Sequence, residues 1–427
     1  MKQISLRELI FYVWRSSNLY RKLWESRGFD PEKDFHKDED LKNIPVITKK
    51  ELRAIDLKNR TTASTYDGPY FLGFSSGTTG FPLSVFHNSY TKPSYYRFIE
   101  KLDAGKRTSC LILRPWHMMP VFINATLKGG YFNSEARVIC GDINNLEFYA
   151  RLAKENEVDY LLTSPHTAIR LAAILEKKKY SISYIKSILI SGSPLSSAAI
   201  QLLKQYYGDA TILYAYAIAE APAAIGLKSS LCDALNKISP NAYHLNTEDY
   251  ILEINRGASV ITSLRKNPTP LIRYAIEDQI ILKNNFRCSC GFPNGPICIV
   301  GPRIGEEFYK IGGYSFHIEH VKYALKKLTY LFTDDFTLQL EQAVYEKQLI
   351  TIPRLFLKPR KWFVKFLNKK LIAEIITKSF YINQNGKYIS FKDELQKKLL
   401  QPLEINFNST IKGRRILPAS ETVKPFY

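Results

Sequence analysis

The sequence predicts an α/β protein with a large N-terminal domain, whose mostly parallel sheets are flanked by helices, and a small α+β C-terminal domain. The first observation is that short apolar runs such as Cys110-Leu111-Ile112-Leu113 alternate with helical stretches through most of the chain. The second is that residues 304–427 show a different order of helices and strands. The third is the length, since 427 residues suffice for two or three domains with a sizeable core.

Composition and charge narrow the class of partner. The chain is 45% hydrophobic and 23% charged, which is ordinary for a folded globular protein. Lys and Arg number 60 against 40 Asp and Glu, so the net charge of +20 favours an acidic partner: ATP, CoA, an anionic sugar, nucleic acid or a membrane face. There is no RNA-binding signature, zinc-finger spacing or basic-region heptad, so we do not expect nucleic acid.

The start of the chain and the cysteines bear on the compartment. Arg7, Glu8 and Arg15 interrupt the apolar pattern of residues 1–20, which is unlike a signal peptide, and no stretch approaches the roughly 20 apolar residues of a membrane span. We therefore expect a cytoplasmic protein. The six cysteines do not form a disulfide framework in a chain of this size. Three of them have apolar neighbours and are predicted core residues: Cys110, Cys140 and Cys298.

The large domain is expected to begin with an amphipathic helix over residues 6–24, where apolar residues recur at helical spacing. A second helix is capped near Thr48. A strand at 84–87 and a helix at 95–102 follow. Alternation then predicts strands at 110–113, 158–162, 185–190 and 211–214, with helices at 146–155 and 167–177. Ligands of such sheets bind beyond the carboxyl ends of the strands.

The small domain is predicted to contain helices at 319–327 and 391–400 and strands at 336–341, 349–352 and 403–407. Between them, residues 358–370 place six cations beside Trp362, Phe363, Phe366 and Leu367, which predicts an amphipathic basic helix. We favour a helix packed on the core with a solvated basic face. Contact with a membrane surface or with CoA phosphates is the alternative.

A hydroxyl-rich stretch, Phe74-Ser75-Ser76-Gly77-Thr78-Thr79-Gly80-Phe81-Pro82, is the strongest functional signal. Four hydroxyl side chains and two glycines lie within six residues. Such a backbone can bend closely around phosphate oxygens and bind them with N–H and O–H donors. The stretch is not a Walker loop, because no Gly-Lys-Ser/Thr follows. A flexible polar turn is the alternative interpretation.

This stretch resembles the signature loop of the AMP-forming adenylating enzymes, which join a carboxylate to AMP before passing it to a thiol or an amine. The chain is most similar to the phenylacetate-CoA ligase branch and its relatives in capsule biosynthesis. The resemblance covers nearly the whole chain. It implies that the ATP phosphates are held by Ser75, Ser76, Gly77, Thr78, Thr79 and Gly80, with Thr78 and Thr79 also acting in catalysis. Leu83 stands where many members of the superfamily carry Lys.

Two further motifs follow the family order. Ala215-Tyr216-Ala217-Ile218-Ala219-Glu220 occupies the place of Tyr-Gly-any-Thr/Ser-Glu, which implies that Tyr216 packs on the adenine and Glu220 holds Mg²⁺. Pro270-Leu271-Ile272-Arg273-Tyr274-Ala275-Ile276-Glu277-Asp278 resembles the segment whose last Asp binds the ribose hydroxyls. The alternatives are a surface Glu after a buried strand and an Asp in a solvated turn.

The resemblance also divides the chain into residues 1–302, the adenylate-forming domain, and residues 303–427, a mobile lid domain that swings between two half-reactions. At the hinge, Arg303 would contact the nucleotide. Near the end, Lys412-Gly413-Arg414-Arg415 resembles the terminal Lys-any-any-Arg, whose Lys stabilises charge between the carboxylate and the α-phosphate. The alternatives are an exposed Arg in a loop and a basic surface cluster, and Ile411 replaces the usual Gly.

A cysteine and histidine set predicts a metal site. Cys288-Ser289-Cys290-Gly291 places two thiols on a tight turn, with Cys232 and His244 upstream. Some phenylacetate-CoA ligase relatives carry Cys, His and Cys-any-Cys in this order, which implies a closed structural zinc site. A reduced cysteine pair with a chance histidine is the alternative.

The sequence therefore predicts an AMP-forming acid–thiol (CoA) or acid–amine ligase that uses ATP, Mg²⁺, a structural Zn²⁺ and a small carboxylic acid, with CoA as one acceptor. An acyl pocket is expected near Pro115-Trp116-His117-Met118-Met119, which follows a strand. The alternative is a degenerate nucleotide-binding or scaffold protein of the same fold. Ala217, Ala219, Leu83 and the replacement of Arg-Thr-Gly by Ala275-Ile276-Glu277 motivate it.

Overall fold

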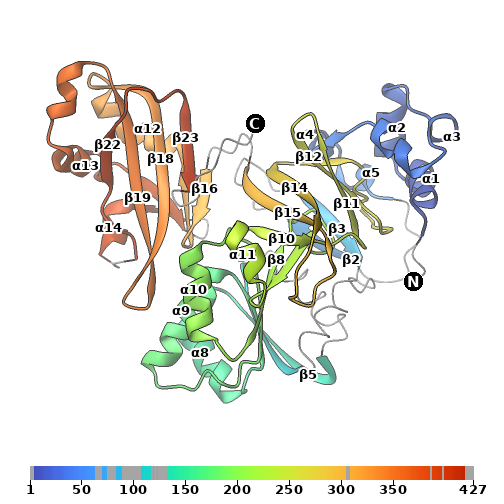
Figure 1. The fold of residues 1–427 in the computed structure, drawn as a ribbon, viewed down its shortest axis with the longest axis horizontal. Helices are drawn as coiled ribbons and strands as arrows, with labels where there is room; N and C mark the ends of the chain where they lie inside the picture. The colour runs from blue at the N-terminus through green and yellow to red at the C-terminus, as the bar shows by residue number, and fades with distance from the viewer. Residues whose placement is uncertain are drawn as a thin grey trace.

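The computed structural model of the chain describes residues 4–62, 70–74, 83–88, 107–116, 132–303, 308–384, 387–396 and 399–418, together with Met119 and Ile123. Short helices open the chain: α1 (Leu6–Ser16), α2 (Asn18–Ser26), α3 (Pro31–Asp34), the 3₁₀ helix η1 (Asp38–Asn43), α4 (Lys49–Ala54) and α5 (Leu57–Arg60). Figure 1 shows them in blue at one end of the molecule.

A nine-stranded sheet forms the centre of the large N-terminal part, in the order β14-β15-β10-β9-β8-β7-β6-β4-β5. The half from β5 to β8 is parallel: β4 (Arg107–Leu113), β5 (Phe132–Gly141), β6 (Tyr160–Thr163), β7 (Ser187–Ser191) and β8 (Thr211–Tyr216). The other half is antiparallel: β9 (Gly226–Ser229), β10 (Ala242–Leu245), β14 (Asp278–Phe286) and β15 (Gly295–Arg303). The α/β class is confirmed, and the antiparallel half was not anticipated.

Helices connect the parallel strands, as the alternation predicted: α8 (Leu146–Glu155), α9 (Pro165–Lys177) and α10 (Ser197–Tyr206). Each begins at a polar cap, because Asn145, Ser164 and Ser196 accept a bond from a backbone N–H in the first turn. A further helix, α11 (Asp233–Ile238), precedes β10. Buried apolar side chains from these helices and strands join one continuous core.

A second sheet lies beside the first in the order β1-β13-β12-β11. Its strands are β1 (Ile47–Thr48), β11 (Tyr250–Asn255), β12 (Ala258–Ser263) and β13 (Tyr274–Ile276). The short β1 pairs in parallel with β13, so the start of the chain is placed next to the segment that leads into Asp278. A separate ribbon pairs β2 (Tyr70–Phe74) with β3 (Ser84–Asn88), the strands on either side of the hydroxyl-rich stretch.

The C-terminal part, orange and red in Figure 1, has its own core. One sheet has the order β22-β19-β18-β23 and the other β16-β17-β20-β21. The elements are β16 (Phe308–Ile311), β17 (Tyr314–His317), α12 (Ile318–Leu325), η3 (Lys326–Leu328), β18 (Phe332–Tyr345), β19 (Gln348–Pro359), η4 (Trp362–Phe366), α13 (Lys369–Thr377), β20 (Tyr381–Gln384), β21 (Lys387–Ser390), α14 (Phe391–Leu395), β22 (Glu404–Phe407) and β23 (Arg414–Pro418).

The long β18–β19 hairpin reaches from the small part to α9 and α10 of the large part (Figure 1). Ser196 Oγ donates to Gln342 Oε1 at 2.7 Å, and Tyr206 Oη donates to the carbonyl of Lys347 at 2.9 Å. Lys347 Nζ also lies 2.5 Å from Glu176 Oε1. Leu349 packs in the core of the large part. Both polar contacts and the apolar contact of Leu349 therefore join the two parts of the chain.

Three expected helices differ from the structure. The helix expected over 6–24 is two helices, because Ser17 is extended (φ −116°, ψ 114°) and redirects Tyr20 and Trp24 into the core. The basic helix expected over 358–370 is wrong: β19 continues to Pro359, and α13 begins only after Asn368, which caps it. The helix expected over 391–400 ends at Leu395, and Leu400 forms a β-bridge with Thr351. The helix expected over 95–102 lies outside the described residues.

Candidate active site

Polar side chains gather where the parallel strands end. Arg114 directly follows β4, and its Nη2 donates to the carbonyl of Thr163 at 2.9 Å and to Ser191 Oγ at 2.5 Å. One guanidinium therefore joins the carboxyl ends of β4, β6 and β7. Burial lowers the pKa of Arg114 to about 9, so the group stays cationic at neutral pH.

Gly192 makes this arrangement possible. Its φ is +85°, in the left-handed region, and a Cβ built on it would lie 2.4 Å from Arg114 Nη1. Any larger residue would both strain the backbone and displace the guanidinium. The backbone at Gly192 therefore lies close to the Arg114 cation. This contact is at the edge of the sheet where α/β proteins bind ligands.

Tyr216, the last residue of β8, meets Asp278, the first residue of β14. The Tyr216 hydroxyl donates to Asp278 Oδ2 at 2.7 Å, and both side chains are buried. One face of the Tyr216 ring packs on Tyr243, with the ring centroids 6.0 Å apart. Arg303 is the cross-strand partner of Asp278 in the β14–β15 pair, although its side chain lies outside the described part of the structure. Three residues expected to bind the nucleotide are thus neighbours.

Glu220 lies in the turn after β8 and is 6% exposed. Tyr274 donates its hydroxyl to Glu220 Oε1 at 3.2 Å. Lys49 Nζ lies 3.7 Å from the same oxygen and 2.8 Å from Glu277 Oε2. The ammonium of Lys49 therefore balances two carboxylates, of which Glu220 is buried and Glu277 is partly exposed.

The remaining oxygen of Glu220, Oε2, forms no hydrogen bond or ion pair with any described residue. Mg²⁺ binds hard oxygen ligands and commonly takes only one or two carboxylates in addition to substrate phosphates and water. The donor set therefore fits a magnesium ion.

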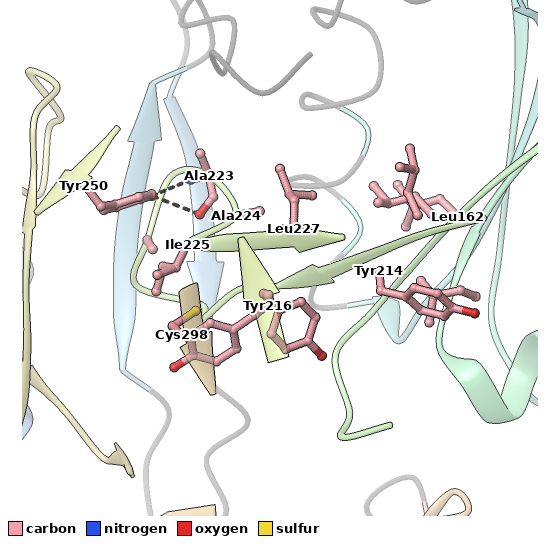
Figure 2. Packing of buried hydrophobic residues seen from close by; sticks show 14 of the residues in the cluster. Leu162, Tyr214, Tyr216, Ala223, Ala224, Ile225, Leu227, Tyr250 and Cys298 are labelled. Carbon is pink, nitrogen blue, oxygen red and sulfur yellow. Dashed lines mark hydrogen bonds between the residues drawn. The ribbon is translucent and has the colours of Figure 1, made fainter. Parts of the chain in front are cut away.

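Hydrogen bonds from two distant side chains to the backbone of Ala223 and Ala224 fix the turn that carries Glu220. The hydroxyl of Tyr250 accepts from the Ala223 N–H and donates to the Ala223 carbonyl, both at 2.9 Å (Figure 2). Asn246 Nδ2 donates to the carbonyl of Ala224 at 3.0 Å. Backbone groups in a turn of this kind need such partners when they are buried. The position of the Glu220 carboxylate is therefore well determined before any ligand binds.

His87 connects the same turn to the strand that follows the hydroxyl-rich stretch. Its Nε2 lies 3.0 Å from the carbonyl of Ala219, the residue before Glu220, so Nε2 carries the proton that this bond requires. His87 is 4% exposed, and burial lowers its pKa to about 4. The imidazole is therefore neutral at physiological pH and acts as a positioning group.

Acid is expected to destabilise the protein through His87. The unfolded chain binds the imidazole proton near pH 6.5, whereas the folded chain resists protonation until about pH 4. The unfolded state thus binds more protons in this window, and the stabilising contribution, complete above pH 6.5, is lost as the pH falls. We expect a loss on the order of 2 kcal/mol between pH 7 and 4.5, measured by urea unfolding.

His87→Gln should remove only the part of the pH dependence that His87 contributes, because burial also lowers the pKa of His166, to about 3, and that imidazole adds a similar loss in the same window. His36→Gln, which changes an exposed histidine, should leave the pH dependence unchanged. Equal pH dependence in the wild type and in His87→Gln would contradict the assignment to His87.

Cys232, His244, Cys288 and Cys290 converge from three segments: the start of α11, β10 and the turn after β14. Their ligand atoms all lie within 4.8 Å of one another. Cys232 Sγ is 3.2 Å from Cys288 Sγ and 3.5 Å from His244 Nε2, and Cys290 Sγ is 3.2 Å from His244 Nε2. Hydrogen bonds from Cys232 and His244 lower the pKa of the Cys290 thiol. Three sulfurs and one imidazole nitrogen are the donor set of a closed tetrahedral zinc site.

All six cysteines are free, as expected. Cys110 and Cys298 are fully buried in the core, whereas Cys140 is only partly buried.

Several predicted site residues are not placed. Ser75, Ser76, Gly77, Thr78, Thr79 and Gly80 lie outside the described residues, as do His117 and Met118 of the expected acyl pocket. In that pocket Trp116 is 60% exposed and Met119 is buried. Lys412 is exposed and contacts none of the described site residues through a hydrogen bond or ion pair. Its neighbour Gly413 donates its N–H to Asp335 Oδ1 at 2.9 Å, which holds the segment on the small part.

The sequence reasoning missed Lys49, His87, Arg114 and Tyr274. Lys49 could have been suspected, because Thr48 and Glu51 form a capping box that places Lys49 in the first turn of α4. Tyr274 stands within a quoted motif, but its contact with Glu220 is made across the fold. No local signal marks His87 or Arg114, since both act through the carbonyls of distant segments.

Comparisons with known proteins identify the family of this chain. The family model described as AMP-binding enzyme matches residues 22–260. The chain belongs to the AMP-binding enzyme family. No curated protein sequence matches it significantly. No helix in the described part of this family member is long and apolar enough to cross a membrane.

Solved structures show that this member of the AMP-binding family has an established fold. The chain is similar to 2-hydroxyisobutyryl-CoA ligase in the thioesterification state, with a TM-score of 0.60, 16% identity, and coverage of 97% of this chain and 88% of that one. An open conformation of the same ligase gives a TM-score of 0.58 with 14% identity, covering 97% and 90%. The likeness extends over both parts of the chain.

Proposed function

We propose that this AMP-binding family member is an AMP-forming ligase that activates a carboxylic acid with ATP and transfers the acyl group to CoA, another thiol or an amine. The observation that carries the proposal is the group formed by Tyr216, Asp278 and Glu220 beyond β8. A buried carboxylate with one hydroxyl donor suits the paired hydroxyls of ribose, and a second buried carboxylate suits a magnesium ion on the phosphates. The ligase structurally similar to this chain was solved with an acyl-adenylate and CoA.

The adenylation half-reaction asks for positioning and charge neutralisation and needs no general base. An oxygen of the acid, ionised at neutral pH, attacks the α-phosphorus of ATP, and the bond from that phosphorus to the pyrophosphate oxygen breaks. The acceptor then attacks the acyl carbon, either as a thiolate or as a neutral amine that gives up a proton to water, and AMP leaves with the electron pair of the broken C–O bond. Thr78 and Thr79 would bind the departing phosphates, and bound Mg²⁺ would supply charge neutralisation there.

Two elements complete the proposed site from the small part. Lys412 would enter to stabilise the charge between the carboxylate and the α-phosphate, and Arg303 at the division between residues 1–302 and 303–427 would contact the nucleotide. The polar contacts between the β18–β19 hairpin and α9 and α10 support a small domain that can change its position.

The finer assignment is the phenylacetate-CoA ligase branch with its capsule-biosynthesis relatives. The convergence of Cys232, His244, Cys288 and Cys290 supports it, since some relatives in that branch carry this ligand order. In this proposal the site holds a structural Zn²⁺ that fixes the turn after β14, the strand that begins at Asp278.

Exchange of radiolabelled pyrophosphate into ATP, measured with a panel of aromatic, aliphatic and hydroxylated acids, tests the proposal. Acid-dependent exchange requires adenylation, so exchange with any acid supports it. ATP binding without exchange across the whole panel would instead support the second candidate, a nucleotide-binding scaffold. That candidate is favoured by Leu83, which is 1% exposed in the core at the place of a common lysine, and by the loss of a hydroxyl at Ala219.

Tyr216→Phe is expected to raise the KM for ATP by roughly 10-fold with little change in kcat, because a hydrogen bond to a charged group contributes about 1.5–3 kcal/mol. The reason is that Asp278 would lose the donor that aims it. Initial rates of exchange at varied ATP concentration measure the effect. Tyr243→Phe is the matched control, because it keeps the ring stack and removes a hydroxyl that does not bind Asp278. An unchanged KM in Tyr216→Phe would count against a role of this pair in nucleotide binding.

A further inference from the structure

The small part presents an apolar surface that its own core leaves uncovered. Trp362 is 76% exposed, Phe366 is 80% exposed and Leu371 is 55% exposed, and Phe363 and Leu367 are also exposed. Large apolar side chains that gather on a surface generally mark an interaction site. We call these five residues the aromatic patch.

The aromatic patch is an ordered feature. Val364 and Ile372 are buried beneath it in the core of the small part. The Trp362 ring lies edge-on to Phe363 at 6.3 Å and to Phe366 at 6.0 Å, so the three rings form one cluster. Asn368 accepts from the N–H groups of Lys370 and Leu371, which fixes α13 directly after the rings.

Cations surround the aromatic patch. Residues 358–370 contain six Lys and Arg and no Asp or Glu. Lys358 is paired with Asp335 and Arg360 binds backbone carbonyls, but Lys361, Lys365, Lys369 and Lys370 are exposed and form no ion pair with any described residue. Two of these lysines stand in the first turn of α13, where the helix dipole favours anions and disfavours cations. Lys369 also lies over the Phe407 ring, 5.4 Å from its centroid, so the unfavourable placement applies chiefly to Lys370, and an external anion would relieve it.

We propose that the aromatic patch and its lysines dock the protein on an anionic phospholipid bilayer. Trp rings prefer the level of the lipid headgroups, and lysines beside them meet the negative lipid surface. Charge complementarity favours this occupant, since the whole chain carries a net charge of +20. The surface lies on the small part, away from the Asp278 and Glu220 site, and its assignment does not depend on the proposed enzymatic function.

Co-sedimentation of the full chain with vesicles tests this proposal. Vesicles of phosphatidylcholine with about 30% phosphatidylglycerol should bind at least about 10-fold more tightly than vesicles of phosphatidylcholine alone, and added salt should weaken binding. Lys365→Ala with Lys370→Ala should lower binding by roughly 10-fold or more, because each basic residue near an anionic surface contributes about 5-fold. Trp362→Ala with Phe366→Ala should lower it at least as much.

Matched controls change the large part in the same way. Lys154→Ala with Lys283→Ala removes two exposed charges, and Phe148→Ala removes a ring that is 41% exposed, and neither should alter binding. Trp362→Phe should retain binding yet abolish the blue shift of tryptophan emission on vesicle addition. All variants should keep the wild-type unfolding temperature and pyrophosphate exchange.

Four results would overturn the proposal. If vesicle binding does not depend on the anionic lipid, or if the wild type and the patch variants bind equally, the aromatic patch is not a site for anionic membranes. The wild type could also fail to bind vesicles while the patch variants lose transfer of the acyl group to the acceptor. That result would assign the surface to CoA phosphates or to the large part of the chain. Displacement of the protein from vesicles by an oligonucleotide that binds the same lysines more tightly would assign it to nucleic acid.

Discussion

Lys412→Met is expected to lower the rate of acid-dependent pyrophosphate exchange by about 100- to 1,000-fold, the loss typical of one well-placed electrostatic group in a transition state. The substitution keeps an unbranched side chain of similar length and removes only the ammonium. Because Lys412 is exposed and its segment is tied to β18 through Gly413 and Asp335, no loss of stability should accompany the effect.

The second half-reaction, transfer of the acyl group from the adenylate to the acceptor, distinguishes a role of Lys412 in adenylation from a general loss of activity. With the acyl-adenylate of an acid found by the exchange panel, AMP release on addition of the acceptor should stay within a few-fold of the wild type, since the lysine acts on the first half only. Lys378→Met, which changes another exposed lysine of the small part, is the control. Full exchange activity in Lys412→Met would assign the adenylating charge to another cation, of which Lys49 is the nearest to Glu220.

The parallel half of the fold could be predicted because its signals are local. Residues 110–113 and 188–190 are short continuous apolar runs, and the structure places them in β4 and β7, where they are buried. Ser164 and Ser196 precede their helices as caps, which is also a local feature. The antiparallel half was missed because short strands such as β9, Gly226-Leu227-Lys228-Ser229, carry polar residues at buried positions, so neither a continuous apolar run nor an apolar–polar alternation marks them.

The basic segment shows why periodicity alone is insufficient. Its apolar residues recur at a spacing that a helix would use, yet Lys358 and Pro359 belong to the end of β19 and Asn368 starts a new helix. The intervening segment forms only the short 3₁₀ helix η4, which buries Val364 and exposes Trp362 and Phe366. Tertiary pairing of β19 with β18 determined the boundary, and this pairing leaves no trace in the local sequence.

The residues of the candidate site were also predicted only in part. Family motifs named Tyr216, Glu220 and Asp278, and the structure brings Tyr216 and Asp278 into direct contact. The residues that hold Glu220 were not predicted, because Lys49 and Tyr274 are separated from it in the sequence by 171 and 54 positions. Such contacts follow from the parallel pairing of β1 with β13, which only the fold reveals.

Removal of the proposed zinc is expected to destabilise the large part of the chain strongly. Cys290→Ser or His244→Ala should lower the unfolding temperature by roughly 10 °C and reduce bound zinc from about one ion per chain to a small fraction, since a closed Cys/His site contributes several kcal/mol to folding. The effect should reach the nucleotide site, because Cys288 and Cys290 follow β14, the strand that Asp278 begins. Metal analysis of gently purified protein and thermal unfolding with and without a chelator measure both quantities.

Cys140→Ser is the matched control, because it removes a partly buried thiol that lies outside the cluster. It should keep the zinc content and change the unfolding temperature by only a few degrees. Phe292 stacks on the His244 ring at 5.3 Å and holds it toward the sulfurs, so Phe292→Leu should weaken zinc retention without removing a ligand. If the wild type, prepared without chelator, contains clearly less than stoichiometric zinc and a chelator leaves its unfolding temperature unchanged, the four side chains are a reduced thiol cluster whose stability comes from packing alone.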